Sequence, residues 1–242
     1  MLYKFKTKFL IIILPILSLF FTGADLCYHV STVNGTKIEK NIDLVKEQAI
    51  CDLAKRLGIP VNEIQTILHV SDRCWLIPLI ALEEHKLCLI DIFSKSDKNY
   101  MKYYLNGKLI SPRQVEERFY NRGLYNLWEK PNASSITFII DYDNKSVGRI
   151  GVGPIRNRGG VDCEIGYAIK QEYSGKGLTI SSVRAVLNLL HYMTEKNSKI
   201  YNFKRLRATV SENNRSSVHI LEKLNFKRNG RCGKKIEYFY FF

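Results

Sequence analysis

The sequence predicts an α/β fold in which helices pack on a sheet that contains an antiparallel hairpin. A short apolar run at 165–169 precedes a glycine-rich turn and a segment, 178–193, whose apolar residues recur at helical spacing. The order of strand and then helix returns at 206–224. Two β-branched segments, 136–142 and 147–152, flank a polar turn and are typical of a hairpin.

The first half of the chain is interpreted as mainly helical. Residues 40–57 carry apolar side chains at helical spacing and end at Gly58-Ile59-Pro60, a glycine C-cap with proline beyond it. A second short helix or strand is expected at 61–70. The first strand of the main domain is expected at 75–79, followed by a helix at 82–93.

Two further elements complete the prediction. Ser111-Pro112-Arg113-Gln114 combines a hydroxyl cap, proline at the first helical position and Gln at the third, which predicts a helix that runs to about residue 128. Residues 236–242 form an aromatic terminal strand that is expected to close the sheet. The glycines between 148 and 153 lie inside a strand pattern, where close packing explains them better than a nucleotide loop.

Residues 1–24 are typical of a targeting segment. Three lysines precede an apolar run at 9–21, and Thr22-Gly23-Ala24 places small residues at an expected cleavage position. The run is short for a transmembrane helix and contains a proline. A signal peptide, a membrane anchor that contacts lipid through 9–21 and a mis-assigned start all stay open, and so does the compartment.

Composition limits the class of partner. The formal net charge is +14, with 37 Lys+Arg against 23 Asp+Glu, which suits anionic partners such as the phosphates of a cofactor. No dense basic run with interleaved aromatic residues argues for nucleic acid, so DNA is not expected. The six cysteines form no Cys-x-x-Cys pair and are expected to be structural, mostly buried thiols, with disulfides as the alternative if the protein is exported. No metal site is expected.

The turn Ser174-Gly175-Lys176-Gly177 joins the strand at 165–169 to the following helix. Backbone N–H groups converge at such a turn and the helix dipole adds partial positive charge, so the turn suits a phosphate or pyrophosphate. It matches neither the P-loop nor the Gly-x-Gly-x-x-Gly pattern. From this stretch alone, glycines that serve only backbone geometry are an equally good interpretation.

A second stretch, 208–226, decides between these interpretations. Its residues Asn214, Ser217, Ile220, Leu221, Glu222, Lys223, Leu224 and Phe226 follow the pattern Asn-x-x-Ser-x-x-Val-Leu-Glu-Lys-Leu-Gly-Phe. Asn225 replaces the glycine, and after glycine asparagine best tolerates the left-handed backbone of a helix C-cap. Together with the Tyr-x-Gly-Lys-Gly turn, this stretch resembles the GNAT family of acetyl-CoA-dependent N-acetyltransferases. Within it, the chain is similar to the branch of ribosomal-protein N-terminal acetyltransferases. The resemblance covers about residues 72–242.

The resemblance implies the GNAT acyl-CoA N-acyltransferase fold, a mixed and mostly antiparallel sheet that is splayed in the middle with helices on both faces. It implies transfer of an acetyl group from acetyl-CoA to a primary amine, with a protein N-terminus as the preferred acceptor. A small-molecule amine or aminoglycoside is the alternative acceptor. The expected organisation is a targeting segment at 1–24, a small helical extension at 25–71 and the acetyltransferase domain at 72–242.

The same resemblance implies residues that bind acetyl-CoA. The strand residues Tyr167, Ala168 and Ile169 would pair with the pantetheine amides through their backbone, and Asn214 would bond to the pantetheine arm. The pyrophosphate would lie on the turn made by Ser174, Gly175, Lys176, Gly177, Leu178 and Thr179. The family often has Gln or Arg in place of Ser174 and Gly or Ala in place of Thr179, so both residues are departures.

The implied catalytic residues are Glu164 and Ser217. Glu164 is the candidate general base for the acceptor amine, directly or through water. Ser217 would lie near the sulfur and protonate or stabilise the departing thiolate, although Asn214 and Ser217 are also residue types that cap helices. Many relatives use a tyrosine as general acid at the position of Leu221. The resemblance also suggests an acceptor wall of aromatic side chains, namely Tyr103, Tyr104, Tyr120 and Trp128.

Two other classes of function compete with the enzyme. One is an exported domain that keeps the fold, has lost catalysis and binds a partner through aromatic and basic surface. The other is a basic module that binds RNA or the ribosome. Saturable binding of acetyl-CoA separates the enzyme from both.

Overall fold

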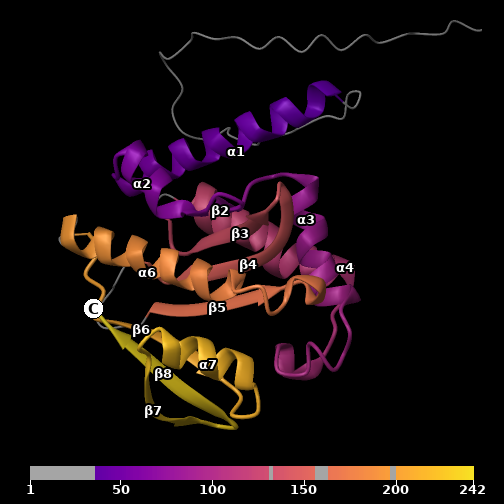
Figure 1. Cartoon of the computed structure of the whole chain (residues 1–242), viewed down its shortest axis with the longest axis vertical. Coiled ribbons are helices and arrows are strands. Elements are labelled where there is room, and N and C mark those ends of the chain that lie inside the picture. Colours follow the sequence, from indigo (N-terminus) through magenta and orange to yellow (C-terminus); the bar gives the residue numbers. More distant parts are fainter. Residues whose placement is uncertain (1–35, 131–132, 156–162, 197–199) are drawn as a thin grey trace, which may run out of the picture.

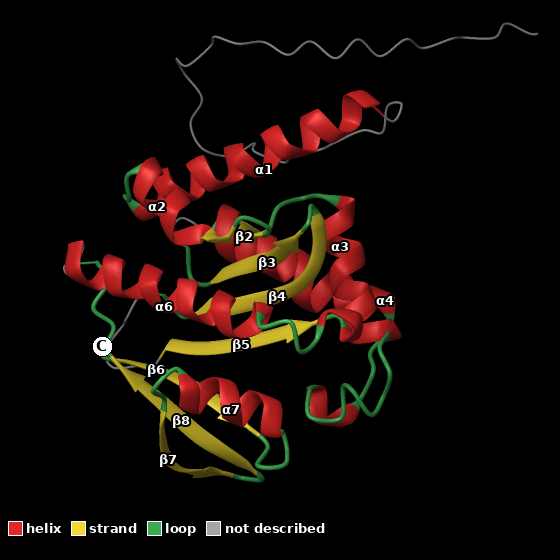
Figure 2. Ribbon diagram, in the orientation of Figure 1, coloured by secondary structure: helices red, strands yellow, loops and turns green. Residues whose placement is uncertain are grey.

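The computed structural model describes residues 36–130, 133–155, 163–196 and 200–242 (Figures 1 and 2). Its centre is an eight-stranded sheet in the order β1-β2-β3-β4-β5-β6-β8-β7. The strands are β1 His69–Ser71, β2 Cys74–Pro78, β3 Ile136–Tyr142, β4 Lys145–Gly153, β5 Cys163–Ile169, β6 Arg205–Val210, β7 Lys227–Cys232 and β8 Lys235–Phe241.

Seven α-helices surround the sheet in the described part of the chain. They are α1 Thr36–Leu57, α2 Val61–Leu68, α3 Glu83–Ile90, α4 Pro112–Val115, α5 Arg122–Leu124, α6 Leu178–Lys196 and α7 Arg215–Lys223. Segments of π-helix extend α3 and α4–α5, at Asp91–Lys95, Glu116–Asn121 and Tyr125–Glu129. Within the described residues, no helix combines the length and apolarity that a bilayer crossing needs.

The sheet is mixed and mostly antiparallel, as predicted. Among the described strands, β5 and β6 form the parallel pair, and their register holds only at Cys163↔Leu206 and Glu164↔Arg207. On its other side β5 pairs with β4 continuously from Gly148↔Ile169 to Gly153↔Glu164. The two strands therefore meet at one end and diverge beyond Glu164, which Figure 2 shows as a widening gap between the ribbons. This divergence confirms the splayed sheet.

Both faces of the sheet are covered. The larger hydrophobic cluster joins α1, α2 and α6 to one face, with Leu53, Val186 and Ile150 among its fully buried members. A second cluster on the opposite face packs α3 and its π-helical extension against β3, through Phe93 and Ile139. The second cluster also includes Ala168 of β5, so both faces of β3 and β5 are buried against helices.

Several local expectations are confirmed in detail. Ser111 and Gln114 form the capping box. Asp143 and Asn144 both have positive φ, 52° and 57°, as the tight turn between β3 and β4 requires. Asn225 lies after α7 with φ of 63°, a left-handed conformation that asparagine tolerates better than other non-glycine residues.

The C-terminal end of the sheet corrects one expectation. The terminal strand β8 does not close the sheet, because it lies between β6 and a further strand, β7. Every residue of β7 is exposed and its sequence, Lys-Arg-Asn-Gly-Arg-Cys, has no apolar alternation. A strand without a buried face gives no periodicity signal, so sequence reasoning missed it.

The two helices expected as a separate extension pack directly onto the main sheet. Leu57 and Leu68 join the core cluster. On α1 the buried Lys46 amine lies 2.6 Å from the Asp141 carboxylate of β3 and 3.7 Å from Glu84. Such a pair fixes the helix on the sheet, since losing either partner would leave a buried charge uncompensated. The boundary at residue 71 stays a prediction, and the proposed targeting segment at 1–24 lies outside the described residues.

We expect His85 to make stability depend on pH. The side chain is fully buried, and its Nδ1 accepts the Ile80 N–H at 3.3 Å. Burial, together with the Lys46 charge, lowers the pKa of His85 to about 3. In the unfolded chain this imidazole has a pKa of about 6.5, so below that pH the unfolded state binds a proton that the folded state does not bind. The free energy of unfolding therefore falls as the pH falls below about 6.5. Between pH 7 and 5 the expected loss is about 2 kcal/mol.

Urea unfolding of the full chain at pH 7 and pH 5 measures this loss. His85→Asn keeps an acceptor for the Ile80 N–H and removes the titration, so the loss between the two pH values should shrink by about 2 kcal/mol. His219→Asn, on an exposed face of α7, is the matched control and should behave as the unaltered protein. An unchanged pH dependence in His85→Asn would refute the assignment.

Candidate active site

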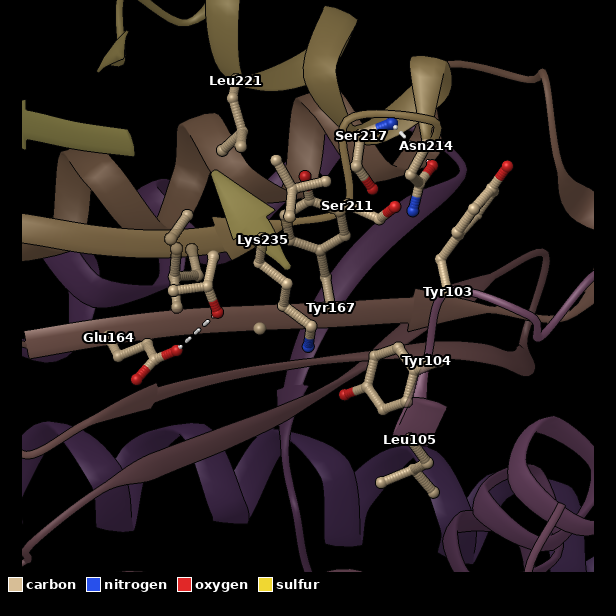
Figure 3. A pocket seen from close by; sticks show the side chains of 15 residues that line it. Tyr103, Tyr104, Leu105, Glu164, Tyr167, Ser211, Asn214, Ser217, Leu221 and Lys235 are labelled. Atoms are coloured by element: carbon tan, nitrogen blue, oxygen red, sulfur yellow. Dashed lines mark hydrogen bonds between the residues drawn. The ribbon is translucent and has the colours of Figure 1, made fainter. Parts of the chain in front are cut away.

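A cavity of about 400 Å³ lies where β5 and β6 diverge (Figure 3). Its walls come from the first half of β5, the end of β6, the first turns of α7, the start of β8 and the loop before α4. The lining residues are Tyr103, Tyr104, Leu105, Glu164, Ile165, Gly166, Tyr167, Ala208, Thr209, Val210, Ser211, Asn214, Ser217, Leu221 and Lys235.

The divergence leaves one edge of β5 without a strand partner beyond Glu164. The side chains on this stretch alternate, with Ile169 in the main core and Ala168 packed against the second cluster. Backbone N–H and C=O groups on that edge that no side chain satisfies must bond to water or a ligand, because unpaired groups are costly when buried. An extended ligand that carries amides would supply such partners.

Glu164 lies on the cavity wall at the last registered pair of β5 and β6. Its Oε2 accepts from Arg207 at 2.8 Å, and its Oε1 accepts from the Thr209 hydroxyl at 3.2 Å. Arg207 also lies 3.5 Å from Glu237. The carboxylate is thus held in place by two donors and its charge is compensated, while 41% of the side chain stays accessible.

Tyr167 and Ser217 meet in the same cavity from β5 and α7. Burial raises the pKa of the Tyr167 phenol to about 12, an effect that the neighbouring Ser217 hydroxyl partly opposes. The phenol is therefore protonated at neutral pH and able to donate a proton. Sequence reasoning assigned only the backbone of Tyr167 to the site. Leu221, which stands where many relatives have a tyrosine, also lines the cavity.

Asn214 acts as the N-cap of α7, as its alternative interpretation proposed. Its Oδ1 accepts the Ser217 backbone N–H at 3.2 Å. The residue also lines the cavity, and within the described chain its side-chain amide donates no hydrogen bond. Capping therefore orients the Asn214 side chain and leaves its amide N–H groups able to donate hydrogen bonds to a ligand.

The glycine turn lies at the N-terminus of α6, next to the end of β5. Gly175 and Gly177 have φ of 79° and 76°, and no atom lies within 4 Å of a Cβ built on either. Among the described residues, none accepts a hydrogen bond from the backbone N–H of Gly175, Lys176 or Gly177. Leu178 sends its side chain into the core, so only its backbone faces the turn, and Thr179 follows it in the helix. The turn thus offers free N–H groups and open space.

Two side chains in the turn have partners that the sequence did not indicate. The Ser174 hydroxyl lies 2.5 Å from the Tyr100 hydroxyl, which also donates to the Ile169 carbonyl at 3.0 Å. Tyr100 therefore ties the turn to β5. The Lys176 amine lies over the rings of Tyr173 and Tyr142, at 4.8 and 5.8 Å.

The prediction of an aromatic acceptor wall is wrong for two of its four residues. Tyr103 and Tyr104 line the cavity, but Tyr120 and Trp128 do not. Tyr120 is buried in the second cluster and donates its hydroxyl to the Leu82 carbonyl. Trp128 donates its indole N–H to the Leu79 carbonyl at 2.7 Å. Both side chains hold the α3–α5 segment on the sheet.

The described residues contain no cluster of His, Cys, Asp and Glu side chains that could bind a metal ion. The described cysteines form no disulfide with one another. Cys74, Cys88 and Cys163 are buried, as expected for structural thiols, whereas Cys51 is partly buried and Cys232 is exposed.

Comparison with protein families identifies the fold. Residues 79–227 match the model of the acetyltransferase (GNAT) domain, which is more than half of the chain. The chain belongs to the GNAT family. Transfer of an acetyl group from acetyl-CoA, the predicted activity, is the chemistry of this family. A search of curated proteins returned no match.

Solved structures support the GNAT fold at low sequence identity. The ribosomal L7/L12 α-N-protein acetyltransferase RimL, in complex with coenzyme A, has a TM-score of 0.57 and 16% identity over 72% of this chain and 97% of its own. The Salmonella typhimurium enzyme that modifies the N-terminal serine of L7/L12 has a TM-score of 0.56 and 16% identity, over 72% and 98%.

A third similar structure is that of a self-immunity acetyltransferase. The microcin C7 self-immunity acetyltransferase MccE, in complex with acetyl-CoA and AMP, has a TM-score of 0.55 and 15% identity, over 72% of this chain and 94% of its own. At these identities the likeness concerns the fold. The acceptor of this GNAT domain has to be argued from its own residues.

Proposed function

We propose that this protein acetylates the N-terminal amine of a protein, with acetyl-CoA bound between β5 and β6. The observation that carries the proposal is the divergence of these strands beside the free N–H groups of Gly175, Lys176 and Gly177. An unpaired strand edge suits the two amides of pantetheine, and the turn at the N-terminus of α6 suits the pyrophosphate.

The acceptor class rests on two lines of support. The turn and the Asn214–Phe226 stretch follow the pattern of the ribosomal-protein N-terminal acetyltransferases. The fold also resembles two solved structures of acetyltransferases that act on the N-terminus of L7/L12. A small-molecule amine is the other acceptor that the fold accommodates, and a panel of acceptors separates the two.

The chemistry requires one proton to leave the amine and one to reach the sulfur. The amine nitrogen forms a bond to the thioester carbonyl carbon, and the bond from that carbon to sulfur breaks. Glu164 takes the amine proton, directly or through water. Both of its carboxylate oxygens already accept hydrogen bonds, from Arg207 and Thr209, so a relay through water fits the geometry better than direct contact with the amine. We propose that the Tyr167 phenol donates a proton to the departing thiolate and that the Ser217 hydroxyl holds this phenol in place.

Acetyl-CoA should stabilise the full chain against heat. At about 100 times its Kd, the ligand should raise the melting temperature by about 5 to 10 °C. Gly177→Val places a side chain on the turn and strains its left-handed backbone, so the shift should largely disappear. No shift with the unaltered protein at millimolar acetyl-CoA would refute the proposal.

The control for this experiment is Gly233→Val. Gly233 also has positive φ, 59°, and open space around a built Cβ, but it lies in the turn between β7 and β8. The two variants share the backbone strain, so both should lose basal stability, and only Gly177→Val should lose the response to acetyl-CoA. Equal responses would show that the glycine turn does not bind the cofactor.

Steady-state kinetics test the two proton-transfer residues. Glu164→Gln and Tyr167→Phe should each lower kcat by about a hundredfold, the usual effect of a lost general base or acid, with acetyl-CoA affinity nearly unchanged. Tyr120→Phe is the matched control, because burial raises the pKa of this phenol also to about 12 and it lies outside the cavity. Unchanged turnover in either site variant would remove that residue from the mechanism.

A further inference from the structure

The cavity contains a lysine whose charge is not compensated within the described structure. Lys235 begins β8, and its side chain extends across the cavity toward β5, between Glu164 and Tyr104 in Figure 3. Its amine forms no ion pair or hydrogen bond with a described residue. Glu164, the acidic residue of the lining, is already paired with Arg207. A ligand group of negative charge would therefore find Lys235 available.

A second cation lies directly behind this wall. Arg149 of β4 donates to the Tyr104 hydroxyl at 3.3 Å, and its guanidinium lies over the rings of Phe119 and Phe93 at 5.3 and 6.0 Å. Its buried Nε has no partner in the described chain, and no described carboxylate lies within ion-pair distance. Gly151 makes room for it, because a Cβ there would meet the guanidinium at 2.4 Å.

The segment that leads to Lys235 is also positively charged. Residues 227–235, which form β7, its turn and the start of β8, include five basic residues and no acidic one. Two of them, Arg228 and Arg231, pair with Glu212, and the others lie exposed or on the cavity wall. Such a field favours the encounter with acidic acceptors.

We propose that Lys235, supported by the charge of Arg149, binds a carboxylate of the acceptor, so that preferred acceptors carry an acidic group close to the reacting amine. This inference rests on the proposed acetyltransferase function and specifies its substrate class. In a polypeptide the carboxylate belongs to an acidic residue at the second or third position. A free amino acid presents the same chemistry through its α-carboxylate.

The test is the rate of acetylation of short peptides by the full chain. Peptides that begin Ser-Asp, Ser-Asn and Ser-Lys have the same amine and differ in the neighbouring charge. The unaltered protein should prefer Ser-Asp over Ser-Asn in kcat/KM by about tenfold, the effect of one charge-assisted hydrogen bond. The preference should appear mainly in KM, since the carboxylate does not react. Free serine and aspartate form a second arm, and faster acetylation of these than of peptides would assign the carboxylate to an amino acid.

Charge reversal provides the decisive variants. Lys235→Glu should reverse the order of the peptides and favour Ser-Lys. Lys234→Glu makes the same change of net charge at the next residue, which is exposed and outside the cavity lining, and should keep the preference for Ser-Asp. Arg149→Met keeps an unbranched chain against the two rings and should weaken the preference without reversing it.

The outcomes distinguish failure of the carboxylate site from failure of the proposed acetyltransferase function. If acetyl-CoA binds and amines are acetylated without regard to charge, or if Lys235→Glu and Lys234→Glu behave alike, the carboxylate site is refuted and the enzyme stands. If no amine is acetylated, the proposed function itself fails. A reversed preference in Lys235→Glu alone supports the inference.

Discussion

The short parallel contact between β5 and β6 is the constraint on which the site depends. Two registered pairs hold the strands together, and the second, Glu164↔Arg207, is reinforced by an ion pair of 2.8 Å. Beyond it the strands separate, and the opened edge faces a cavity that the first turns of α7 close from the other side. A continuous ladder would satisfy the backbone of 165–169 and leave no room for a ligand. The same pair that joins the strands also orients the candidate base.

The rest of the fold keeps these strands apart. α6, α1 and α2 cover one face, and the α3–α5 segment covers the other face of β3 and β5, so β5 cannot move to close the gap without disturbing two packed cores. Buried polar contacts add to this, notably Lys46 with Asp141, which fixes the N-terminal helix on β3. At the cavity, Tyr100 ties the glycine turn to the end of β5. The groups that would receive acetyl-CoA are thus positioned before it binds.

The sequence predicts local structure well and contacts between distant segments poorly. The glycine turn, the capping box at Ser111 and the left-handed Asn225 follow from residue chemistry over a few positions, and the structure confirms them. β7 was not predicted, because an exposed strand has no apolar alternation in its sequence. Tyr120 and Trp128 were placed in the acceptor wall because they are aromatic, whereas long-range packing takes them into the core. Lys235, Arg149 and the Tyr167 phenol come together only through the sheet order, which neither composition nor spacing reveals.

The central claim is that a coenzyme A thioester lies in the gap between β5 and β6. Amide hydrogen exchange with and without coenzyme A tests it most directly, because the unpaired edge and the turn carry exchangeable N–H groups that no described residue accepts. We expect the ligand to slow exchange at 165–169 and 175–180 and to leave β1 and β2 unchanged. Protection confined to other segments, or none at saturating ligand, would contradict the account.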